Sequence, residues 1–529
     1  KGPKHKNLFK FDMISNDVVL KILCSLGTKK STDVLGFDMN LLYLSREIMS
    51  PFLTKLFNAS LTTGLIPSDW KKARVSPIYK GKGDSMETGN YRPISVIGHI
   101  AKCMEKLVQK QLMTFLIDNN LITIDQSAYR KFHNTQTSLH RVTEDWIENI
   151  CDNLFTGICL LDIKKCFDTI NHDILLKKLS FYGIQNDELI WFKNYLSCRK
   201  LVVKSNAKYS SEKTVNIGVP QGSVLGPILF LVYINDLSQN VDIGCLNMYA
   251  DDVLVYCCDD SVDKVNSKLQ KCLDDASSWY TRNQLCINAD KSNALLVASA
   301  HMLNNKENEL EVMLNGSKLS CVNSADYLGV KLDERLSWNE HVSNLCKKLS
   351  FKMSRLSRAK RCLSTKCLHD IYNTIIQPTL DYAITVWGKT SDANISKIQH
   401  FQNYAARIIT GNFDYINHRG IDLVKNMGWM TVPSRCDYFT ILLLFKCIHG
   451  LAPSYLQNEI TMNIEINQRN TRSHDMNLFL PFPEKESYKN KLFYGGAKSW
   501  NDLPDELKDI AKLDPFKCNL KKWVKSKQF

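Results

Sequence analysis

Three aspartates are the residues of this chain whose types and spacing could do chemistry. Asp251 and Asp252 are adjacent and lie between two apolar, β-prone segments, and Asp162 ends an almost wholly apolar run earlier in the chain. Burying two anions side by side is costly unless a cation neutralises them, and carboxylate oxygens of this kind suit Mg²⁺. On its own, an acidic pair in a turn is more often a solvated turn, so the surrounding sequence has to decide.

Two predicted elements must position these carboxylates. Residues 156–162 are typical of a buried strand, and residues 246–256 of a strand, a tight acidic turn and a return strand. If the strand and the hairpin are neighbours in one sheet, the three carboxylates converge. With two divalent ions roughly 3.5–4 Å apart, such a cluster is a site for in-line phosphoryl displacement. One ion would activate an attacking hydroxyl, and the other would hold a triphosphate and its leaving pyrophosphate.

The composition favours a globular protein with a polyanionic partner. The 529 residues suggest two to four packed units, and 44% hydrophobic with 23% charged residues is typical of globular domains. Lys and Arg number 68 against 54 Asp and Glu, an excess of 14 that favours nucleic acid. The 18 cysteines are scattered without a secretory signal and indicate reduced intracellular thiols. The longest apolar run, residues 224–234, is too short to span a bilayer.

The order of predicted elements indicates an α+β fold with a sheet backed by helices. Helices are expected within 1–60 and at 99–120, 167–179, 263–281 and 395–450, and strand, loop and helix in succession at 214–235. Strand signals fade after residue 335, and the tail at 460–529 is polar and broken by Pro481, Pro483 and Pro504. Residues 345–362 carry seven Lys or Arg and no acid on an expected helix. That segment is either a solvated face or a phosphate-binding one.

Several segments in order resemble one enzyme family. Residues 161–170, 218–227 and 249–252 look like motifs A, B and C of the reverse transcriptases of non-LTR (LINE-type) retrotransposons. Residues 90–95 and 126–131 resemble the finger motifs of that family, residues 287–292 its motif D and residues 327–330 its primer grip. Ala128 departs from the glycine that is common in the second finger motif. Weaker similarity to jockey-like elements continues at 378–382 and 387–388.

The resemblance implies a right-hand polymerase. We expect a helical N-terminal extension at 1–60, fingers and a palm with an antiparallel sheet at 61–333, a helical thumb at 334–390 and a helical C-terminal region at 391–529. The chain begins without Met, so we expect a fragment of a longer protein that lacks the upstream endonuclease.

The resemblance also implies a metal site. Asp162, Asp251 and Asp252 would bind the metal, with a weaker direct contact from Asp252, and the main-chain carbonyl of Ile163 would complete the shell. Two Mg²⁺ ions are the implied cofactor, with Mn²⁺ as an alternative. Lys291 matches the motif D lysine that would protonate the leaving pyrophosphate, and the alternative is a plain surface lysine.

Further roles follow from the same resemblance. The implied nucleotide-binding residues are Lys80, Lys82, Arg92, Phe167, Gln221 and Gly222, and the implied nucleic-acid-binding residues are Arg130, Tyr327, Leu328, Gly329, Lys348, Lys352 and Arg355. The Phe167 ring would block a ribose 2′-hydroxyl, unless it is an ordinary core residue. Lys348, Lys352 and Arg355 lie at i, i+4 and i+7, which makes one stripe on a helix.

The expected activity is RNA-directed DNA polymerisation by two-metal-ion nucleotidyl transfer. The expected partners are an RNA template, a DNA primer, their RNA–DNA hybrid and dNTPs, with no membrane, and the sequence leaves the oligomeric state open. Such a protein would assemble with RNA in the cytoplasm and act in the nucleus during integration. One alternative is a catalytically inactive, element-derived nucleic-acid-binding protein, which the intact aspartates argue against. Another is an RNA-dependent RNA polymerase, which Phe167 and the Ala before Asp251 disfavour.

Overall fold

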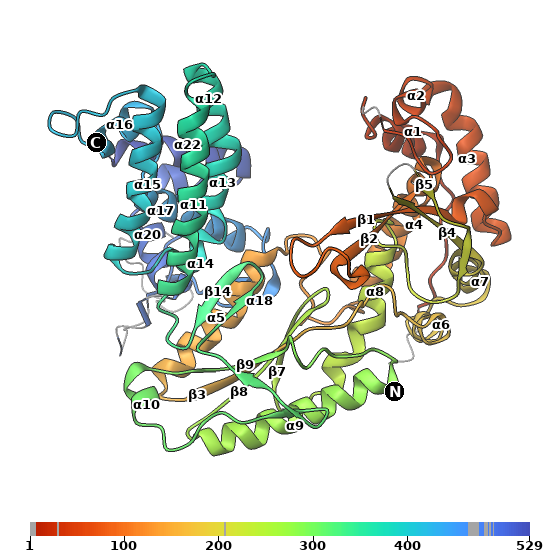
Figure 1. The fold of residues 1–529 in the computed structure, drawn as a ribbon, viewed down its shortest axis with the longest axis horizontal. Coiled ribbons are helices and arrows are strands. Elements are labelled where there is room, and N and C mark those ends of the chain that lie inside the picture. The colour runs from red at the N-terminus through yellow and green to blue at the C-terminus, as the bar shows by residue number, and fades with distance from the viewer. Residues whose placement is uncertain are drawn as a thin grey trace. The chain divides into compact units, whose positions relative to one another are not determined.

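The chain divides into two compact units, and each is built from several separate segments. The computed structural model describes residues 7–28, 31–205, 208–463, 476–480, 485, 488–489 and 491–528. Unit 1 consists of the described residues of Lys1–Tyr129, Asp162–Asp242 and Asp274–Asn288. Unit 2 consists of those of Arg130–Leu161, Ile243–Leu273 and Ala289–Phe529. Figure 1 shows the ribbon and the labels of the elements.

Unit 1 contains a five-stranded sheet with helices around it. The strand order is β2–β1–β4–β5, and β6 also pairs with β4. The strands are β1 (Lys72–Tyr79), β2 (Tyr91–Ile97), β4 (Arg199–Ser205), β5 (Lys208–Tyr209) and β6 (Lys213–Val215). The helices are α1 (Asn16–Cys24), α2 (Met39–Leu44), α3 (Arg46–Thr63), α4 (His99–Asp118), α6 (His172–Phe181), α7 (Asn186–Leu196) and α8 (Gly226–Ile234), with short 3-10 turns η1 (Ser68–Lys71), η2 (Thr88–Asn90) and η3 (Asn235–Gln239).

Unit 2 contains a second five-stranded sheet, in the order β12–β9–β3–β8–β7. Its strands are β3 (Phe155–Leu161), β7 (Cys245–Tyr249), β8 (Asp252–Asp259), β9 (Asn293–Val297) and β12 (Ser320–Cys321). Two small hairpins, β10 (Met313–Leu314) with β11 (Ser317–Lys318) and β13 (Ser324–Tyr327) with β14 (Val330–Asp333), lie outside this sheet. The near-continuous apolar sequence of β3 fits a central strand that is covered on both faces.

Two helices cover the two faces of the unit 2 sheet. Ile158 of β3 belongs to one hydrophobic core with Leu139 and Trp146 of α5 (Thr135–Cys151). On the opposite face, a Cβ atom at Gly157 would lie 2.4 Å from the side chain of Val265 in α9 (Val262–Arg282), so glycine allows the helix to pack closely. The two helices lie on either side of the sheet in Figure 1.

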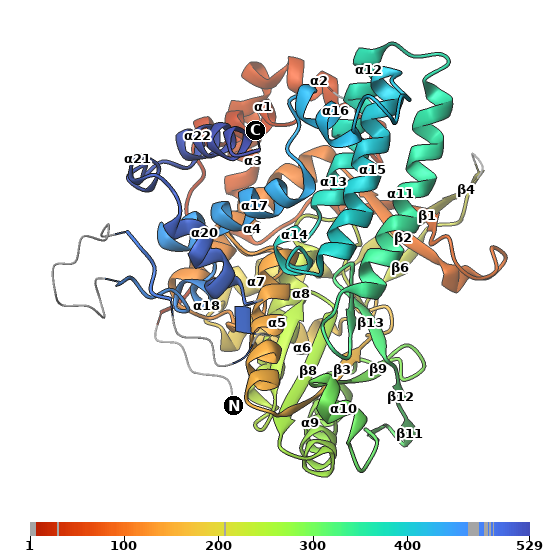
Figure 2. The same ribbon diagram turned by 90° about the vertical axis from the view of Figure 1, so that its left-hand side faces the viewer.

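The rest of unit 2 is helical. The basic segment forms α11 (Asn339–Ala359), which packs beside α15 (Asp392–Thr410), as Figure 2 shows. Further elements are α10 (Ala300–Asn304), α12 (Thr365–Ile371), η4 (Tyr372–Ile376), α13 (Gln377–Asp381), α14 (Ile384–Trp387), α16 (Gly420–Asn426), α17 (Val432–Ile448), α18 (Ser454–Gln457), η6 (Leu492–Gly496), α20 (Ala497–Asn501), α21 (Asp505–Lys508) and α22 (Leu513–Ser526).

The expected mixed helix-and-sheet fold is confirmed, with one shifted boundary. The helix expected from residue 167 begins at His172, where Asn171 caps it by accepting a hydrogen bond from the Ile174 N–H (3.0 Å). Residues 167–170 form a turn instead. The breaks that the sequence predicts at Pro481 and Pro483 lie outside the described residues. No helix in the described part of the chain is long and apolar enough to cross a membrane.

Candidate active site

Asp251 and Asp252 lie at the tip of the β7–β8 hairpin. Tyr249 and Asp252 form the last pair of the antiparallel ladder, and Ala250 and Asp251 make the two-residue turn between them. Ala250 has a φ of 57°, a left-handed conformation that costs a non-glycine residue about 1–2 kcal/mol. Both carboxylates are exposed, while Met248 and the residue after Asp252 are buried. The buried strands therefore hold an exposed acidic turn in a strained conformation.

The sequence left open whether the strand and the hairpin are neighbours in one sheet, and the structure shows that they are. β3 and β8 are antiparallel neighbours, and their last pair joins Leu161 to Val253. Asp162 is the next residue of the chain after Leu161, and Asp252 immediately precedes Val253. As expected from the sequence, β3 ends directly before Asp162 and β8 begins at the acidic turn.

Within unit 1, Asp162 lies in a short backbone ladder with residues 286–288. Its carbonyl accepts a hydrogen bond from the Asn288 N–H (2.7 Å), and the Lys164 N–H donates to the Cys286 carbonyl (2.8 Å). The Asn288 amide also donates to the Asp162 carboxylate (3.2 Å), which orients that side chain. Ile163, between them, is buried and bridges Ile287. Asn288 was not among the predicted site residues, although it lies in the motif D segment.

The glycine-rich loop at 218–223 is joined to the turn after Asp162. The N–H groups of Gly218 and Val219 donate to the carbonyls of Ile170 and Phe167, each at 2.8 Å. The Gln221 amide donates to the Asp168 carboxylate (2.9 Å). These bonds explain why residues 167–170 form a turn rather than the first turn of α6.

The same loop also contacts strand β2. The Ser95 N–H donates to the Gln221 carbonyl (2.6 Å). Gly222 has a φ of 105°, and a Cβ atom there would lie 2.7 Å from the Ser95 carbonyl oxygen. Only glycine combines that φ with such a close approach. The backbone of the loop at 218–223 is therefore held between β2 and the turn that carries Phe167.

Phe167 is half-buried and packs on α8. Its ring centroid lies 4.9 Å from that of Phe230, which is fully buried. This contact fixes one face of the Phe167 ring and leaves part of the side chain exposed, as a residue that contacts a ligand requires.

Three predicted cations come from β2 and from the connection that joins β1 to it. Arg92 and Lys82 are exposed, and Lys80 donates to the Gly89 carbonyl (2.8 Å). Burial raises the pKa of Asp168, and the hydrogen bond from Gln221 and the positive charges of Lys165 and Lys80 act against that rise. Lys80 is thus close enough to the Gln221–Asp168 pair to act on it electrostatically.

The predicted primer-grip residues form a tight turn within unit 2. Leu328 (φ 47°) and Gly329 (φ 79°) connect β13 to β14, and positive φ at both central residues is typical of a type I′ hairpin. The Tyr382 hydroxyl donates to the Leu328 carbonyl (2.6 Å). Tyr327 is buried, and its hydroxyl accepts from the Asn247 amide (3.0 Å). Asn247 and Tyr382 were not predicted as site residues.

The predicted basic stripe on α11 is only partly exposed. Lys348 and Arg355 are exposed, the latter with its guanidinium 4.2 Å from the Phe351 ring centroid. Lys352 is half-buried and donates to the Ile375 carbonyl (2.9 Å) and to the Thr379 hydroxyl. Burial, followed by the charge of Lys348, lowers the pKa of Lys352. Lys352 therefore joins α11 to the neighbouring helices rather than facing solvent fully.

A groove of about 570 Å³ lies between the β13–β14 turn and α11. Gly329, Lys331, Lys347, Lys348 and Tyr382 are among its lining residues. Its cationic wall suits a phosphate backbone.

Two further predicted residues lie elsewhere in unit 2. Arg130 is half-buried, and burial lowers its pKa while the Tyr455 hydroxyl acts in the opposite direction. Lys291 is exposed, and its carbonyl accepts from the Asn293 amide (3.3 Å).

The donor set at the acidic turn fits a hard divalent cation. Among the described residues, no three or more His, Cys, Asp and Glu side chains lie close enough together to hold a metal ion. Mg²⁺ usually takes only one or two protein carboxylates and completes its shell with water and substrate phosphates. The exposed Asp251 and Asp252 side chains on a buried hairpin supply such a pair.

Comparison with known proteins defines the class. Residues 78–332 match the family model described as reverse transcriptase (RNA-dependent DNA polymerase). These residues belong to the reverse transcriptase family, whose members generally use divalent metal ions.

Several relatives of the chain are RNA-directed DNA polymerases of transposons and mobile elements. The chain is 31% identical to a probable RNA-directed DNA polymerase from transposon X-element of Drosophila melanogaster, over 68% of this chain and 40% of the relative. It is 29% identical to the RNA-directed DNA polymerase from mobile element jockey of the same organism, over 77% and 45%. The jockey polymerase of Drosophila funebris is 30% identical, over 78% and 45%. The chain thus spans less than half the length of these relatives.

Proposed function

We propose that this chain is an RNA-directed DNA polymerase that adds dNTPs to a primer 3′-hydroxyl on an RNA template. The observation that carries the proposal is the exposed Asp251–Asp252 turn beside β3, the strand that Asp162 follows directly, within a reverse transcriptase domain.

The proposed cofactor is a pair of Mg²⁺ ions, which Mn²⁺ could replace. Asp162, Asp251 and the Ile163 carbonyl would hold it, with Asp252 contributing less direct contact. When bound, such ions activate the 3′-hydroxyl and neutralise the triphosphate. The hydrogen bond from Asn288 fixes the orientation of the Asp162 carboxylate before any ligand arrives. Lys291, as an exposed cation, would deliver a proton to the departing pyrophosphate.

The proposed nucleotide site is built from the unit 1 loop, β2 and the turn at Phe167. The exposed part of the Phe167 side chain would exclude a 2′-hydroxyl by occupying its space. The ring would be held in position for this because it packs on Phe230. Gln221 and Gly222 would lie along the nucleotide. The Gln221 carbonyl accepts from the Ser95 N–H of β2 and its amide donates to the Asp168 carboxylate, while Gly222 fits closely against the Ser95 carbonyl. Arg92, Lys80 and Lys82 would neutralise the triphosphate from the β1–β2 side.

The proposed template–primer path uses unit 2. The turn of Tyr327, Leu328 and Gly329 would hold the primer, while Lys348 and Arg355 on α11, helped by Lys352, would contact the phosphates of the RNA–DNA hybrid. An A-form hybrid offers few readable base edges in its deep major groove, so shape and phosphate contacts should dominate. Arg130 is the proposed template contact.

The proposed layout is a right hand. Fingers and palm would occupy 61–333 and the thumb 334–390, with helical regions at 1–60 and 391–529. Assembly with RNA would take place in the cytoplasm, and polymerisation in the nucleus during integration.

Primer extension tests the function directly. Purified protein should extend a DNA primer annealed to RNA when dNTPs and Mg²⁺ are supplied, and chelation should abolish extension. Hybrid binding without extension under Mg²⁺ or Mn²⁺ would instead support the inactive nucleic-acid-binding alternative. Extension with NTPs but not with dNTPs would support an RNA-dependent RNA polymerase.

A further inference from the structure

The connection between α15 and α16 is a loop that exposes apolar side chains. We call residues 411–419 the aromatic loop. Phe413, Tyr415 and Ile416 in it are 44%, 63% and 93% exposed. Apolar side chains gathered on an exposed surface of this kind mark interaction sites more often than singly scattered ones do.

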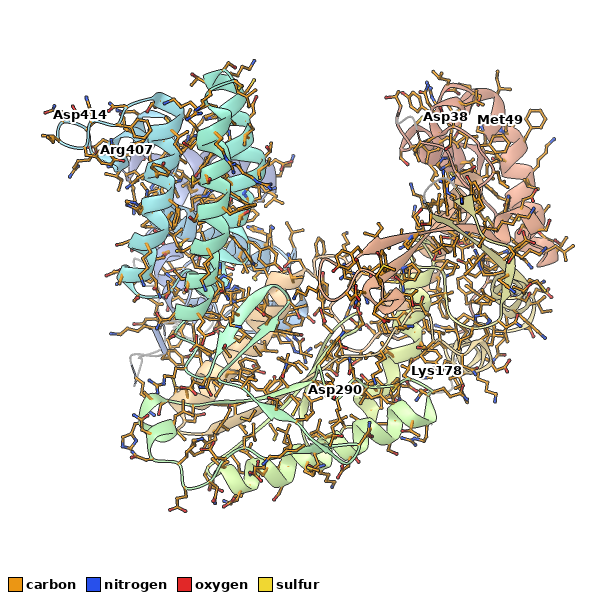
Figure 3. The ribbon with its side chains drawn as sticks, viewed as in Figure 1. Asp38, Met49, Lys178, Asp290, Arg407 and Asp414 are labelled. Atoms are coloured by element: carbon orange, nitrogen blue, oxygen red, sulfur yellow. The ribbon has the colours of Figure 1, made fainter. Side chains whose placement is uncertain are left out.

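A buried arginine fixes the shape of the aromatic loop. Arg407 is only 4% exposed, and its guanidinium donates to the carbonyls of Asn412 (3.3 Å), Asp414 (3.1 Å) and His418 (2.6 Å). The same guanidinium lies 4.1 Å from the Tyr415 ring centroid. Figure 3 labels Arg407 on α15 and Asp414 in the loop. A buried cation is costly unless its donors are satisfied, and here three of its bonds hold one loop.

Asp414 closes the other side of the aromatic loop. Its carboxylate accepts from the N–H groups of Ile416 and Asn417, each at 3.0 Å, and from the Asn417 amide (2.7 Å). These bonds lower the pKa of Asp414. Because the Asp414 carboxylate is bonded within the loop, it fixes the turn that carries Tyr415 and Ile416.

The loop adjoins the most basic segment of unit 2. The Lys360 ammonium, at the end of α11, lies 5.0 Å from the Phe413 ring centroid. Residues 341–369, which include all of α11 except its first two residues Asn339 and Glu340, contain eight Lys or Arg and no Asp or Glu. A surface that combines cations with a rigid apolar projection suits a nucleic-acid duplex, whose phosphates bind the cations and whose base steps accept an apolar wedge.

We propose that the aromatic loop is a duplex-binding wedge, with Ile416 and Tyr415 inserted against base steps while Lys360 and the end of α11 hold the phosphates. This inference rests on the proposed function for its occupant, an RNA–DNA hybrid. The loop would add a contact to the duplex beyond the groove at the primer-grip turn, and it would act on duplex affinity rather than on the chemical step.

Duplex binding and base unstacking test the wedge separately from polymerisation. The probe is an RNA–DNA hybrid that carries a fluorescent base analogue. The emission of this analogue rises when the base is unstacked. We compare the unmodified chain, Tyr415→Ser/Ile416→Ser, and the control Ile48→Ser, which changes a 72% exposed residue of α3 in unit 1.

The double variant should bind the hybrid roughly fivefold or more weakly and lose the rise in emission, since it removes the side chains that contact the bases. Ile48→Ser should change neither quantity. Lys360→Gln should lower the salt slope of binding by about 1 while leaving the emission rise in place. All these variants should keep the extension rate at saturating hybrid.

Equal affinity and equal emission for the double variant and the unmodified chain would overturn the wedge. The wedge would also be overturned if the unmodified chain formed oligomers and the double variant did not, because the loop would then bind a second copy of the chain. If the chain binds and unstacks the hybrid but never extends a primer, the wedge stands and the polymerase proposal fails.

Discussion

The Asn247 side-chain amide donates a hydrogen bond to the Tyr327 hydroxyl across 3.0 Å, and both residues are almost completely buried. Asn247 lies in β7, two residues before the acidic turn begins at Tyr249, and Tyr327 ends β13 beside the Leu328–Gly329 turn. The same amide donates to the Ser138 hydroxyl of α5 (2.9 Å). One buried amide therefore fixes the acidic hairpin and the predicted primer-grip hairpin to each other.

Removing this link should raise the KM for primer more than it lowers kcat. Asn247→Leu leaves the buried Tyr327 hydroxyl without its donor and should lower the free energy of unfolding by about 1–3 kcal/mol, whereas Tyr327→Phe should cost about 1 kcal/mol. The double variant should lose less than the sum, measured by denaturant titration and primer kinetics. Tyr280→Phe is the matched control, because this buried hydroxyl in unit 1 has no hydrogen-bond partner among the residues that the structure describes. Additive losses would show that the two side chains are not coupled.

Neutralising the acids should separate metal ligands from ordinary surface carboxylates. Asp162→Asn and Asp251→Asn should each lower kcat for primer extension by roughly 100-fold or more, since bound metal supplies several kcal/mol of transition-state stabilisation. Asp252→Asn should have a smaller effect. Asp242→Asn removes an exposed acid of unit 1 and should leave kcat unchanged. Near-normal extension by Asp251→Asn would contradict the metal-ligand assignment.

Phe167→Val should relax sugar discrimination. The smaller side chain leaves space for a 2′-hydroxyl, so the ratio of kcat/KM for dNTPs to that for NTPs should fall by at least about tenfold. Single-nucleotide incorporation measures that ratio. Phe230→Leu, which changes only the buried partner of the ring, should have a smaller effect. An unchanged ratio in Phe167→Val would assign Phe167 to the core alone.

Two glycine variants distinguish steric conflict from backbone strain. Gly222 and Gly316 both have positive φ, but a Cβ atom at Gly316 meets nothing within 4 Å, whereas one at Gly222 would meet the Ser95 carbonyl at 2.7 Å. Gly222→Ala should therefore lose most nucleotide affinity, measured as KM for dNTP, because the loop must leave β2. Gly316→Ala should lose some stability only. Equal dNTP kinetics in the two variants would show that the Gly222 loop does not contact the nucleotide.

His341 should make unit 2 sensitive to acid. Burial, followed by the charge of Lys348, lowers the pKa of His341 to about 4 from an ordinary value of 6.5, with Asp326 acting against the shift. Its Nδ1 accepts from the Lys331 N–H (3.2 Å), which requires that nitrogen to be unprotonated. Between pH 6.5 and 4 the unfolded chain therefore binds a proton that the folded chain does not, so stability falls as pH falls through that window.

His341→Gln keeps a hydrogen-bond acceptor and removes the titration. Its free energy of unfolding should decline less between pH 6.5 and 4 than that of the unmodified chain, measured by denaturant titration at each pH. His301→Gln, at an exposed position, is the matched control. Parallel declines in the His341→Gln variant and the unmodified chain would rule out His341 as the group responsible.

The local elements of the site were predictable because they depend on short-range pattern. Two apolar, β-prone segments on either side of an acidic pair predicted the hairpin of Asp251 and Asp252, and the apolar run predicted the strand before Asp162. Ala128 also proved compatible with its position, since Tyr129 rather than Ala128 has positive φ (57°). Lys352 shows the limit of helical spacing, because its partners Ile375 and Thr379 come from other helices.

Long-range polar partners were not predictable from local pattern. Asn288 orients Asp162 from 126 positions away, and Asn247 meets Tyr327 from 80 positions away. The turn at Phe167 replaced an expected helical turn because its carbonyl accepts from Val219, a contact that helical periodicity does not encode. Residues of this kind are chosen by the tertiary fold, so local periodicity classifies them as ordinary polar or core positions.

The division into two interleaved units limits how the chain can be cut or exchanged. The backbone passes from one unit to the other five times, once inside α9 and once between Leu161 and Asp162. Neither unit is therefore encoded by one uninterrupted stretch, and no single breakpoint releases an intact half. Exchange of any single internal stretch between related elements would mix segments of different origin within at least one unit, so this core should be inherited as one block rather than assembled from interchangeable modules.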